Sequence, residues 1–163
     1  MSVTSYALAL GSNRRSRHGA PAETVFAAAK MLGVECLSTI RATAAIGPAG
    51  RAFANAAAIL GSPLGPPELL DRLKALERGF GRRAGRHWGP RVLDLDIILW
   101  SEGSWAGDGL IVPHPEFRRR AFVLEPLAEI APDWRDPLTG LTTRHLLARF
   151  RRGRPVDHGP ART

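Results

Sequence analysis

The sequence contains one cysteine and no long apolar run. Cys36 therefore cannot form a disulfide within the chain, and its neighbours Val34 and Leu37 predict that it fills the core rather than acting as a nucleophile. No stretch reaches the roughly 18 apolar residues that a membrane-spanning helix needs. No basic leader precedes the short apolar run near the N-terminus. These absences argue against disulfide chemistry and a membrane role, and we expect a cytoplasmic protein.

Lysine is also scarce, because only Lys30 and Lys74 occur, and arginine carries almost all of the positive charge behind the formal net charge of +8. A genome rich in G and C biases composition in this way, and single arginines can simply be solvated. One stretch without any acidic residue holds five of them: Arg78, Arg82, Arg83, Arg86 and Arg91. Arg118, Arg119 and Arg120 form a second cluster, in which we expect Arg118 and Arg119 to be solvated. Dense arginine without acidic partners favours a polyanion, either nucleic acid or the phosphates of a nucleotide.

The length of 163 residues and the hydrophobic content of 44% predict one domain over residues 1–150. Residues 151–163 are basic and contain few apolar residues, so we expect a disordered tail there. Strands are expected over 5–10, 35–46, 53–60 and 92–100, with helices over 22–32 and 66–81. The turn 47–52 should be mobile. This order is that of the split β-α-β core of ferredoxin-like folds, so we expect an α+β fold with a mostly antiparallel sheet.

A C-terminal extension is expected to follow this core. Residues 101–109 read as a polar turn and residues 110–113 as a short strand. A helix over 117–130 should be interrupted near Pro126, and a last helix is expected over 142–150.

Two aspartates, Asp94 and Asp96, interrupt the apolar strand predicted over residues 92–100. A carboxylate in a strand covered on both faces is costly unless it is paired or bound to a metal. Because side chains alternate, both aspartates point to one face with Cβ atoms roughly 6 to 7 Å apart. Such a pair suits Mg²⁺ ions that also bind phosphate oxygens. The alternative is a pair of edge-strand aspartates bonded to loop arginines.

The residues just before this strand favour the metal interpretation. Arginines of the first cluster, His87 and Trp88 directly precede it. Metal ligands, phosphate contacts and an aromatic surface can therefore meet at one junction between loop and strand. Magnesium ions bridging phosphate oxygens, with arginine beside the developing charge, recur in phosphoryl transfer.

The stretch GRRAGRHWGPRVLDLDIILW resembles the 6-hydroxymethyl-7,8-dihydropterin pyrophosphokinases of folate biosynthesis, as do VPHPEFRRRAFVLEPLAEIAP downstream and ALALGSN near the N-terminus. The resemblance runs from about Tyr6 to about Phe150, and the combination of GR, WGPR, DLD and VPH at these spacings is highly specific. It implies an enzyme that depends on ATP and Mg²⁺. Such an enzyme transfers the diphosphate of ATP to the hydroxymethyl oxygen of the reduced pterin and releases AMP.

The resemblance also implies roles for the charged residues. Asp94 and Asp96 would hold two Mg²⁺ ions, and Arg82 and Arg91 would brace the transferred phosphates. The positions associated with ATP are Glu77, Arg83, Trp88, His114 and Arg120. Taken alone, Glu77 could pair with a helix neighbour, Trp88 could be a surface anchor, and His114 could belong to a plain turn.

The pterin would lie between two aromatic rings, matching Phe53 and Phe122. Asn55 and the backbone near Thr43 and Ile46 would read its polar edge. Flat faces stack a flat ring, and an asparagine can both donate and accept hydrogen bonds. Without the resemblance, both phenylalanines could be core residues, whereas a lone asparagine in an apolar strand needs a partner.

The chain departs from the family pattern in a few places. Ala84 stands where an arginine is common, so Arg83 or Arg86 would have to reach the same phosphates. Pro115 replaces an aromatic residue, and alanines at 44–45 replace prolines. These departures put the exact phosphate contacts in question but leave the acidic pair intact.

Two other classes of protein fit parts of the pattern. A ferredoxin-like sheet with positive charge also suits an RNA-binding module, but the strands predicted over 5–10 and 53–60 offer only Tyr6 and Phe53 for stacking on bases. A relative that has lost catalysis but still binds pterin or nucleotide is the third class. We expect an enzyme that binds small molecules, without a nucleic-acid or membrane partner, acting as a monomer.

Overall fold

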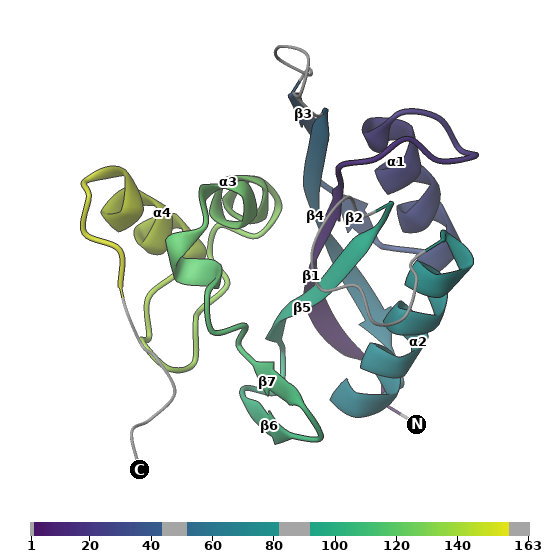
Figure 1. Cartoon of the computed structure of the whole chain (residues 1–163). Helices are drawn as coiled ribbons and strands as arrows, with labels where there is room; N and C mark the ends of the chain where they lie inside the picture. Colours follow the sequence, from purple (N-terminus) through teal and green to yellow (C-terminus); the bar gives the residue numbers. More distant parts are fainter. Residues whose placement is uncertain (1, 44–51, 82–91, 157–163) are drawn as a thin grey trace.

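The computed structural model describes residues 2–43, 52–81 and 92–156 (Figure 1). The first part of the chain forms β1 (Thr4–Ser12), α1 (Pro21–Leu32), β2 (Cys36–Leu37), β3 (Arg41–Thr43), β4 (Phe53–Ser62), α2 (Pro66–Gly79) and β5 (Asp94–Trp100). The second part forms β6 (Trp105–Gly107), β7 (Leu110–Val112), the 3-10 helix η1 (Phe117–Arg119), α3 (Ala121–Ile130) and α4 (Thr143–Arg151). Within these ranges, every helix is too short or too polar to span a membrane.

The main sheet has the strand order β2–β4–β1–β5, with β3 also paired to β4, and every pairing is antiparallel. This confirms the expected α+β fold with an antiparallel sheet and the strand order of a split β-α-β core. β5 forms one edge of the sheet. The turn predicted to be mobile falls almost wholly in residues 44–51, outside the described residues.

The strand predicted over residues 35–46 is divided into β2 and β3 at Ser38. The Ser38 N–H donates to the Ala57 carbonyl at 2.8 Å, and the Ser38 hydroxyl accepts from the Ala57 N–H at 2.9 Å. The serine side chain thus takes the place of a backbone carbonyl. The next N–H, that of Thr39, donates to the Glu129 carboxylate on α3 at 2.7 Å. These side-chain bonds replace the backbone ladder and end the regular strand.

Helices cover both faces of the sheet, with α1 and α2 on one side and α3 and α4 on the other (Figure 1). Alternation along the strands separates two cores. The core under α1 and α2 includes Leu8, Leu10, Ala56, Leu69, Leu73, Leu95 and Ile97. The core under α3 and α4 includes Ala7, Ala57, Ile98, Phe117, Leu124, Leu127 and Leu146.

Three local predictions are corrected by the structure. Cys36 is exposed rather than buried, because it pairs with Ile59 at the outer edge of the sheet. The segment predicted as a polar turn contains β6, which pairs with β7. α3 continues through Pro126 without interruption. In an ordinary helix the N–H at position 126 would donate to the carbonyl of Phe122, and proline has no N–H. Phe122 is half-exposed in the first turn of α3, so water can satisfy its carbonyl instead.

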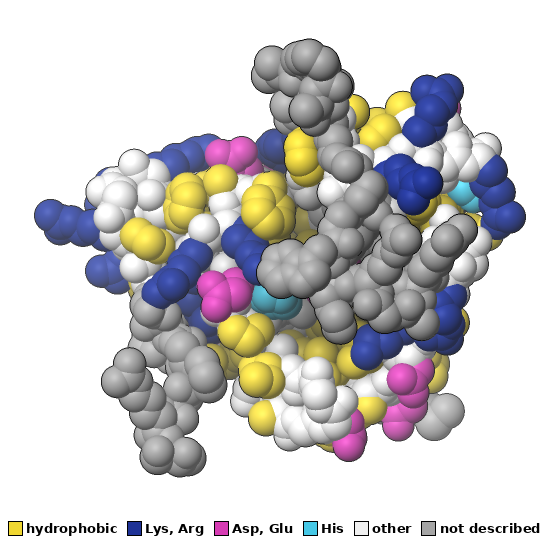
Figure 2. Space-filling model, viewed as in Figure 1, with side chains coloured by type: hydrophobic (Ala, Val, Ile, Leu, Met, Phe, Trp, Pro, Cys, Tyr) yellow, Lys and Arg dark blue, Asp and Glu magenta, His cyan; other side chains and the backbone are white. Residues whose placement is uncertain are grey.

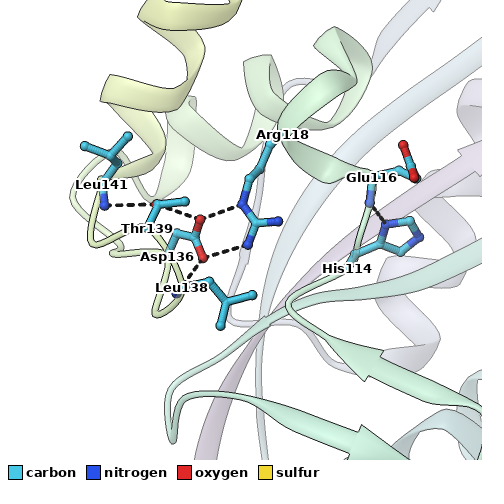
Figure 3. Close-up of polar contacts among 7 residues, drawn as sticks. All are labelled: His114, Glu116, Arg118, Asp136, Leu138, Thr139 and Leu141. Carbon is cyan, nitrogen blue, oxygen red and sulfur yellow. Dashed lines mark hydrogen bonds and ion pairs between the residues drawn. The ribbon is translucent and has the colours of Figure 1, made fainter. Parts of the chain in front are cut away.

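Arg118 is the largest departure from the sequence prediction, because it is buried rather than solvated (Figure 3). Its Nε donates to Asp136 Oδ2 at 2.6 Å and its Nη2 donates to Oδ1 at 2.8 Å. The two side chains are only 1% and 0% exposed. Burial alone would raise the pKa of Asp136. Bonds from Arg118, the Thr139 hydroxyl and the Leu138 N–H more than offset burial, so this pKa lies below its ordinary value.

Replacing Asp136 by asparagine should lower the free energy of unfolding by about 3–5 kcal/mol, because it leaves the Arg118 charge buried without a carboxylate. The stabilisation from the depressed pKa is present above the ordinary aspartate pKa. It is lost as pH falls through the folded pKa of Asp136. Denaturant unfolding measured at a series of acidic pH values should therefore show that the difference in free energy of unfolding between the wild type and Asp136→Asn shrinks as the pH falls.

The matched control is Asp133→Asn, because Asp133 pairs with Arg144 at 2.9 Å in an ion pair whose side chains are 79% and 62% exposed. That change should cost at most about 1 kcal/mol. Equal losses in the two variants would contradict the assignment of Asp136 as a buried partner.

Candidate active site

The floor of the site is a row of residues that crosses three strands. Gly11 on β1 pairs with Asn55 on β4 and with Asp94 on β5. Neighbouring residues such as Leu10 and Leu95 enter the core under α1 and α2, so this row faces α3. A Cβ atom on Gly11 would lie 3.1 Å from the Asn55 Oδ1 atom. The missing side chain therefore leaves room above the sheet between an amide and a carboxylate.

A first cavity of about 420 Å³ opens above this row. Its lining comprises Gly11, Ser12, Asn13, Phe53, Asn55, Asp94 and Phe122. Phe53 and Phe122 are 45% and 50% exposed, which is unusual for large apolar side chains and leaves their rings available to a ligand. The structure thus brings together Phe53, Asn55 and Phe122, three of the residues predicted to bind the pterin. Their arrangement combines aromatic faces with one amide that can donate and accept.

A second cavity of about 340 Å³ lies along the edge strand β5. Its lining comprises Leu70, Lys74, Glu77, Asp94, Leu95, Asp96, Ile97, Gly109, Leu110, Ile111, His114 and Pro115. The residues come from α2, β5, the β6–β7 hairpin and the segment that follows it. Four predicted site residues meet here: Glu77, Asp94, Asp96 and His114. Asp94 lines both cavities, so a ligand in one can reach a ligand in the other at this carboxylate.

Asp94 and Asp96 lie two residues apart on β5, opposite Gly11 and Ala9 of β1. Both are half-buried and point to the same face of the sheet. Among the described residues, no group of three or more histidine, cysteine, aspartate or glutamate side chains could hold a metal ion. A pair of carboxylates beside an open cavity nevertheless fits Mg²⁺, because this ion commonly takes one or two protein carboxylates and completes its shell with phosphates and water.

Glu77 is 2% exposed in the last turn of α2. Its Oε2 accepts from the Leu95 N–H at 2.8 Å, between the two aspartates in sequence. Pairing with a neighbour on its own helix was the simplest alternative for this residue. The bond to Leu95 shows that Glu77 also fixes α2 against β5, and so holds the two walls of the second cavity together.

His114 is held at both its backbone and its ring. Its N–H donates to the Ile98 carbonyl on β5 at 2.9 Å, and its Nδ1 accepts from the Glu116 N–H at 3.1 Å (Figure 3). Burial, followed by the charge of Arg120, lowers the pKa of His114, while Glu116 and Asp94 act in the opposite direction. The ring is therefore neutral near pH 7, with its proton on Nε2, where it can donate to an anionic ligand.

Arg120 stands at the start of α3, next to residues of both cavities in the sequence. It is the residue that precedes the helix, and its guanidinium lies 5.7 Å from the centre of the Phe122 ring. Its charge is among the causes, after burial, that lower the pKa of His114. The predicted association of Arg120 with an anionic ligand is compatible with this position.

Several predicted residues cannot be placed. Arg82, Arg83, Trp88, Arg91 and Ile46 lie outside the described residues, as do Ala84 and Arg86. Thr43 lies on β3 and pairs with Phe53, one of the residues that line the first cavity.

Sequence reasoning missed some cavity residues that the structure adds: Gly11, Ser12, Asn13, Leu70 and Lys74. The GSN motif at residues 11–13 contributed to the family resemblance but was given no role in the site. Its polar residues after an apolar run were a usable signal, whereas nothing local distinguishes Lys74 from a solvated helix residue.

The fold defines an α+β domain in which an aromatic cavity adjoins a carboxylate-lined cavity. The family model for 7,8-dihydro-6-hydroxymethylpterin-pyrophosphokinase (HPPK) matches residues 7–132. The chain therefore belongs to the 7,8-dihydro-6-hydroxymethylpterin-pyrophosphokinase family.

Several relatives carry the name 2-amino-4-hydroxy-6-hydroxymethyldihydropteridine pyrophosphokinase. The protein from Synechocystis sp. is 43% identical over 129 residues, covering 79% of this chain and 65% of the relative. The Pseudomonas aeruginosa protein is 48% identical over 93 residues, covering 56% and 57%. The Haemophilus influenzae protein is 36% identical over 138 residues, covering 80% and 83%. The match to the first two relatives thus spans less than two thirds of their own length.

The ring of His114 gives a direct test of the site's electrostatics. In the protein free of nucleotide and metal, its pKa should lie below about 6.5, the ordinary histidine value. Arg120→Met should raise this pKa, because it removes a nearby cation, and Asp94→Asn should lower it further, because it removes an anion. Titration of the histidine ring signals by NMR measures the pKa of His114 in the wild type and in both variants. Shifts of the same sign in the two variants would contradict the geometry.

Proposed function

We propose that this protein transfers the diphosphate of ATP to the hydroxymethyl oxygen of 6-hydroxymethyl-7,8-dihydropterin and releases AMP, as a step of folate biosynthesis. The observation that carries the proposal is the shared wall at Asp94 between an aromatic cavity and a carboxylate-lined cavity. A flat ring in the first cavity would direct its substituent toward phosphates in the second. Family membership and the names of the relatives support the same reaction.

In this proposal the first cavity binds the pterin. Phe53 and Phe122 stack on its two faces, and Asn55 bonds its polar edge. The backbone near Thr43 and Ile46 contributes further contacts, as the family resemblance implies. Ser12 and Asn13 extend the polar lining toward the same cavity.

The second cavity binds ATP. Neutral His114 donates from Nε2 to a phosphate oxygen, and Arg120 supplies positive charge close to it. Glu77 and Lys74 come from α2, and the apolar residues Leu70 and Leu110 suit the nucleoside. Arg82, Arg83, Trp88 and Arg91 are assigned to the phosphates and nucleoside through the family resemblance alone.

Asp94 and Asp96 would hold two Mg²⁺ ions together with phosphate oxygens and water. When bound, these ions neutralise charge on the phosphates during transfer. The hydroxymethyl oxygen forms a bond to the β-phosphorus as the bond from that phosphorus to the bridging oxygen of AMP breaks, and the hydroxyl proton is released. The protein's own contribution is to align the attacking oxygen with the phosphate and to surround both with fixed charges.

An RNA-binding module is less compatible with these observations. Such a module presents aromatic side chains on the open face of its central strands. Here Tyr6 is fully buried, and helices cover both faces of the sheet (Figure 1). On the face shown in Figure 2, the described lysine and arginine side chains are interspersed with acidic and hydrophobic ones. We further propose that the protein acts in the cytoplasm as a monomer.

Removing either carboxylate should abolish most Mg²⁺-dependent AMP formation. We expect Asp96→Ala to lower kcat/KM at least about 100-fold, which corresponds to about 2.7 kcal/mol, with a smaller loss for Asp94→Ala. Both side chains line a cavity rather than a core, so thermal stability should change little. The assay combines ATP, Mg²⁺ and the reduced pterin alcohol and separates AMP from ADP by chromatography.

The matched control is Asp71→Ala, an exposed aspartate on α2 that lines neither cavity. It should keep wild-type AMP formation. Full activity in both Asp94 and Asp96 variants would refute the metal assignment, and ADP as the product would refute the proposed reaction.

The two aromatic residues of the first cavity should act on the pterin alone. Phe122→Ala or Phe53→Ala should raise KM for the pterin about tenfold, because each removes one stacking face. KM for ATP should change much less, since neither ring lines the second cavity. Phe26→Ala serves as the control, because Phe26 is similarly exposed but lies on α1. Equal rises in both KM values would show that the rings do not bind the pterin selectively.

A further inference from the structure

Residues 114–122 form a wall segment that borders both cavities. His114 and Pro115 line the second cavity near its start, and Phe122 lines the first cavity at its end. Between them the chain forms η1 and turns into α3. Any rotation or shift of this one segment would move residues of both cavities together.

The middle of the wall segment is anchored away from both cavities, in the layer formed by α3 and α4. Phe117 is fully buried in that core, and the Arg118 guanidinium lies 4.7 Å from the centre of its ring. Arg118 then reaches Asp136, in the loop between α3 and α4, through two parallel hydrogen bonds (Figure 3). Neither Arg118 nor Asp136 lines a cavity described here.

The loop that carries Asp136 is itself held rigidly. Asp136 accepts from the Thr139 hydroxyl at 2.7 Å and from the Leu138 N–H at 3.1 Å. Its backbone N–H donates to the Leu141 carbonyl, and its carbonyl accepts from the Gly140 N–H. These bonds hold the carboxylate in place in addition to Arg118, so the carboxylate offers a defined direction to the guanidinium.

A buried ion pair is weak evidence for net stability, because apolar residues of similar volume often serve as well or better. The surrounding core could hold this segment by apolar packing alone. Arg118 Nη1 is also buried without a hydrogen-bond partner among the described residues, which adds cost rather than stability. What two parallel charge-assisted bonds provide, and apolar contacts do not, is a fixed orientation.

We propose that the Arg118–Asp136 ion pair is a positioning device that sets His114 and Phe122 in register with each other, so that both substrates are aligned through one anchor. The inference rests on the proposed function for its kinetic consequence. Arg118 and Asp136 act through the wall segment and touch neither substrate.

The test uses the full chain and three changes at the ion pair. Asp136→Asn breaks the pair, Arg118→Lys keeps the charge but removes the parallel bonds, and the double change Arg118→Met with Asp136→Leu replaces the pair by apolar volume. Asp133→Asn is the control, because it makes the same chemical change in the exposed ion pair nearby. Initial rates of AMP formation give kcat and both KM values, and thermal unfolding is recorded for each variant.

Positioning and simple structural support predict different results for the double variant. If the pair positions the wall segment, the double variant should regain or exceed wild-type thermal stability. It should still lose roughly 10- to 100-fold in kcat/KM for both substrates. Arg118→Lys should show the same joint loss, and Asp133→Asn should show none. Wild-type kinetics in the double variant and in Arg118→Lys would overturn the proposal.

Hydrogen exchange without substrates separates this inference from the proposed function. Amides of residues 114–122 should exchange faster in Arg118→Lys and in the double variant than in the wild type or Asp133→Asn. If the wild type forms no AMP, the proposed reaction fails while the exchange result still decides whether the pair orders this segment. If the wild type forms AMP but exchange and kinetics are unchanged in the variants, the positioning role alone fails.

Discussion

The alternation of side chains along β5 is the constraint on which the site depends. Leu95 and Ile97 enter the core under α1 and α2, and for that reason Asp94 and Asp96 face the opposite side. A slip of one residue would bury two carboxylates and expose two large apolar side chains. The pairing of Gly11 with Asp94 and the bond from the Leu95 N–H to Glu77 hold this register from both sides of the strand.

The two cavities are assembled from segments that lie far apart in the sequence. β1, β4 and β5 supply the floor of the first cavity, and α2 and β5 supply most of the second. Residues 114–122 complete both of them. The C-terminal layer of α3 and α4 is therefore part of the site's construction, because it fixes the segment that closes the two cavities. Asp94 is where they adjoin, and neither cavity can be altered there without affecting the other.

Much of this arrangement could be predicted from local patterns, because alternation and helical periodicity are short-range properties. The acidic pair, Asn55 in an apolar strand and the helix ending near Glu77 were all visible in the sequence. The burial of Arg118 was not, because three consecutive arginines look alike and the choice depends on Asp136, eighteen positions later. Cys36 was misjudged for a similar reason, since apolar neighbours do not reveal an outer strand. The roles of Arg82, Arg83, Trp88, Arg91 and Ile46 stay predictions.

The edge position of β5 gives the site a second consequence. An outer strand with free polar backbone groups is a template on which another polypeptide can add a strand and start aggregation. Here the Leu95 N–H is taken by Glu77, and the Ile98 carbonyl is taken by the His114 N–H. A foreign strand would have to displace both before it could pair along this edge. Glu77 and His114, which line the second cavity, thus also guard the molecule against intermolecular β-sheet growth.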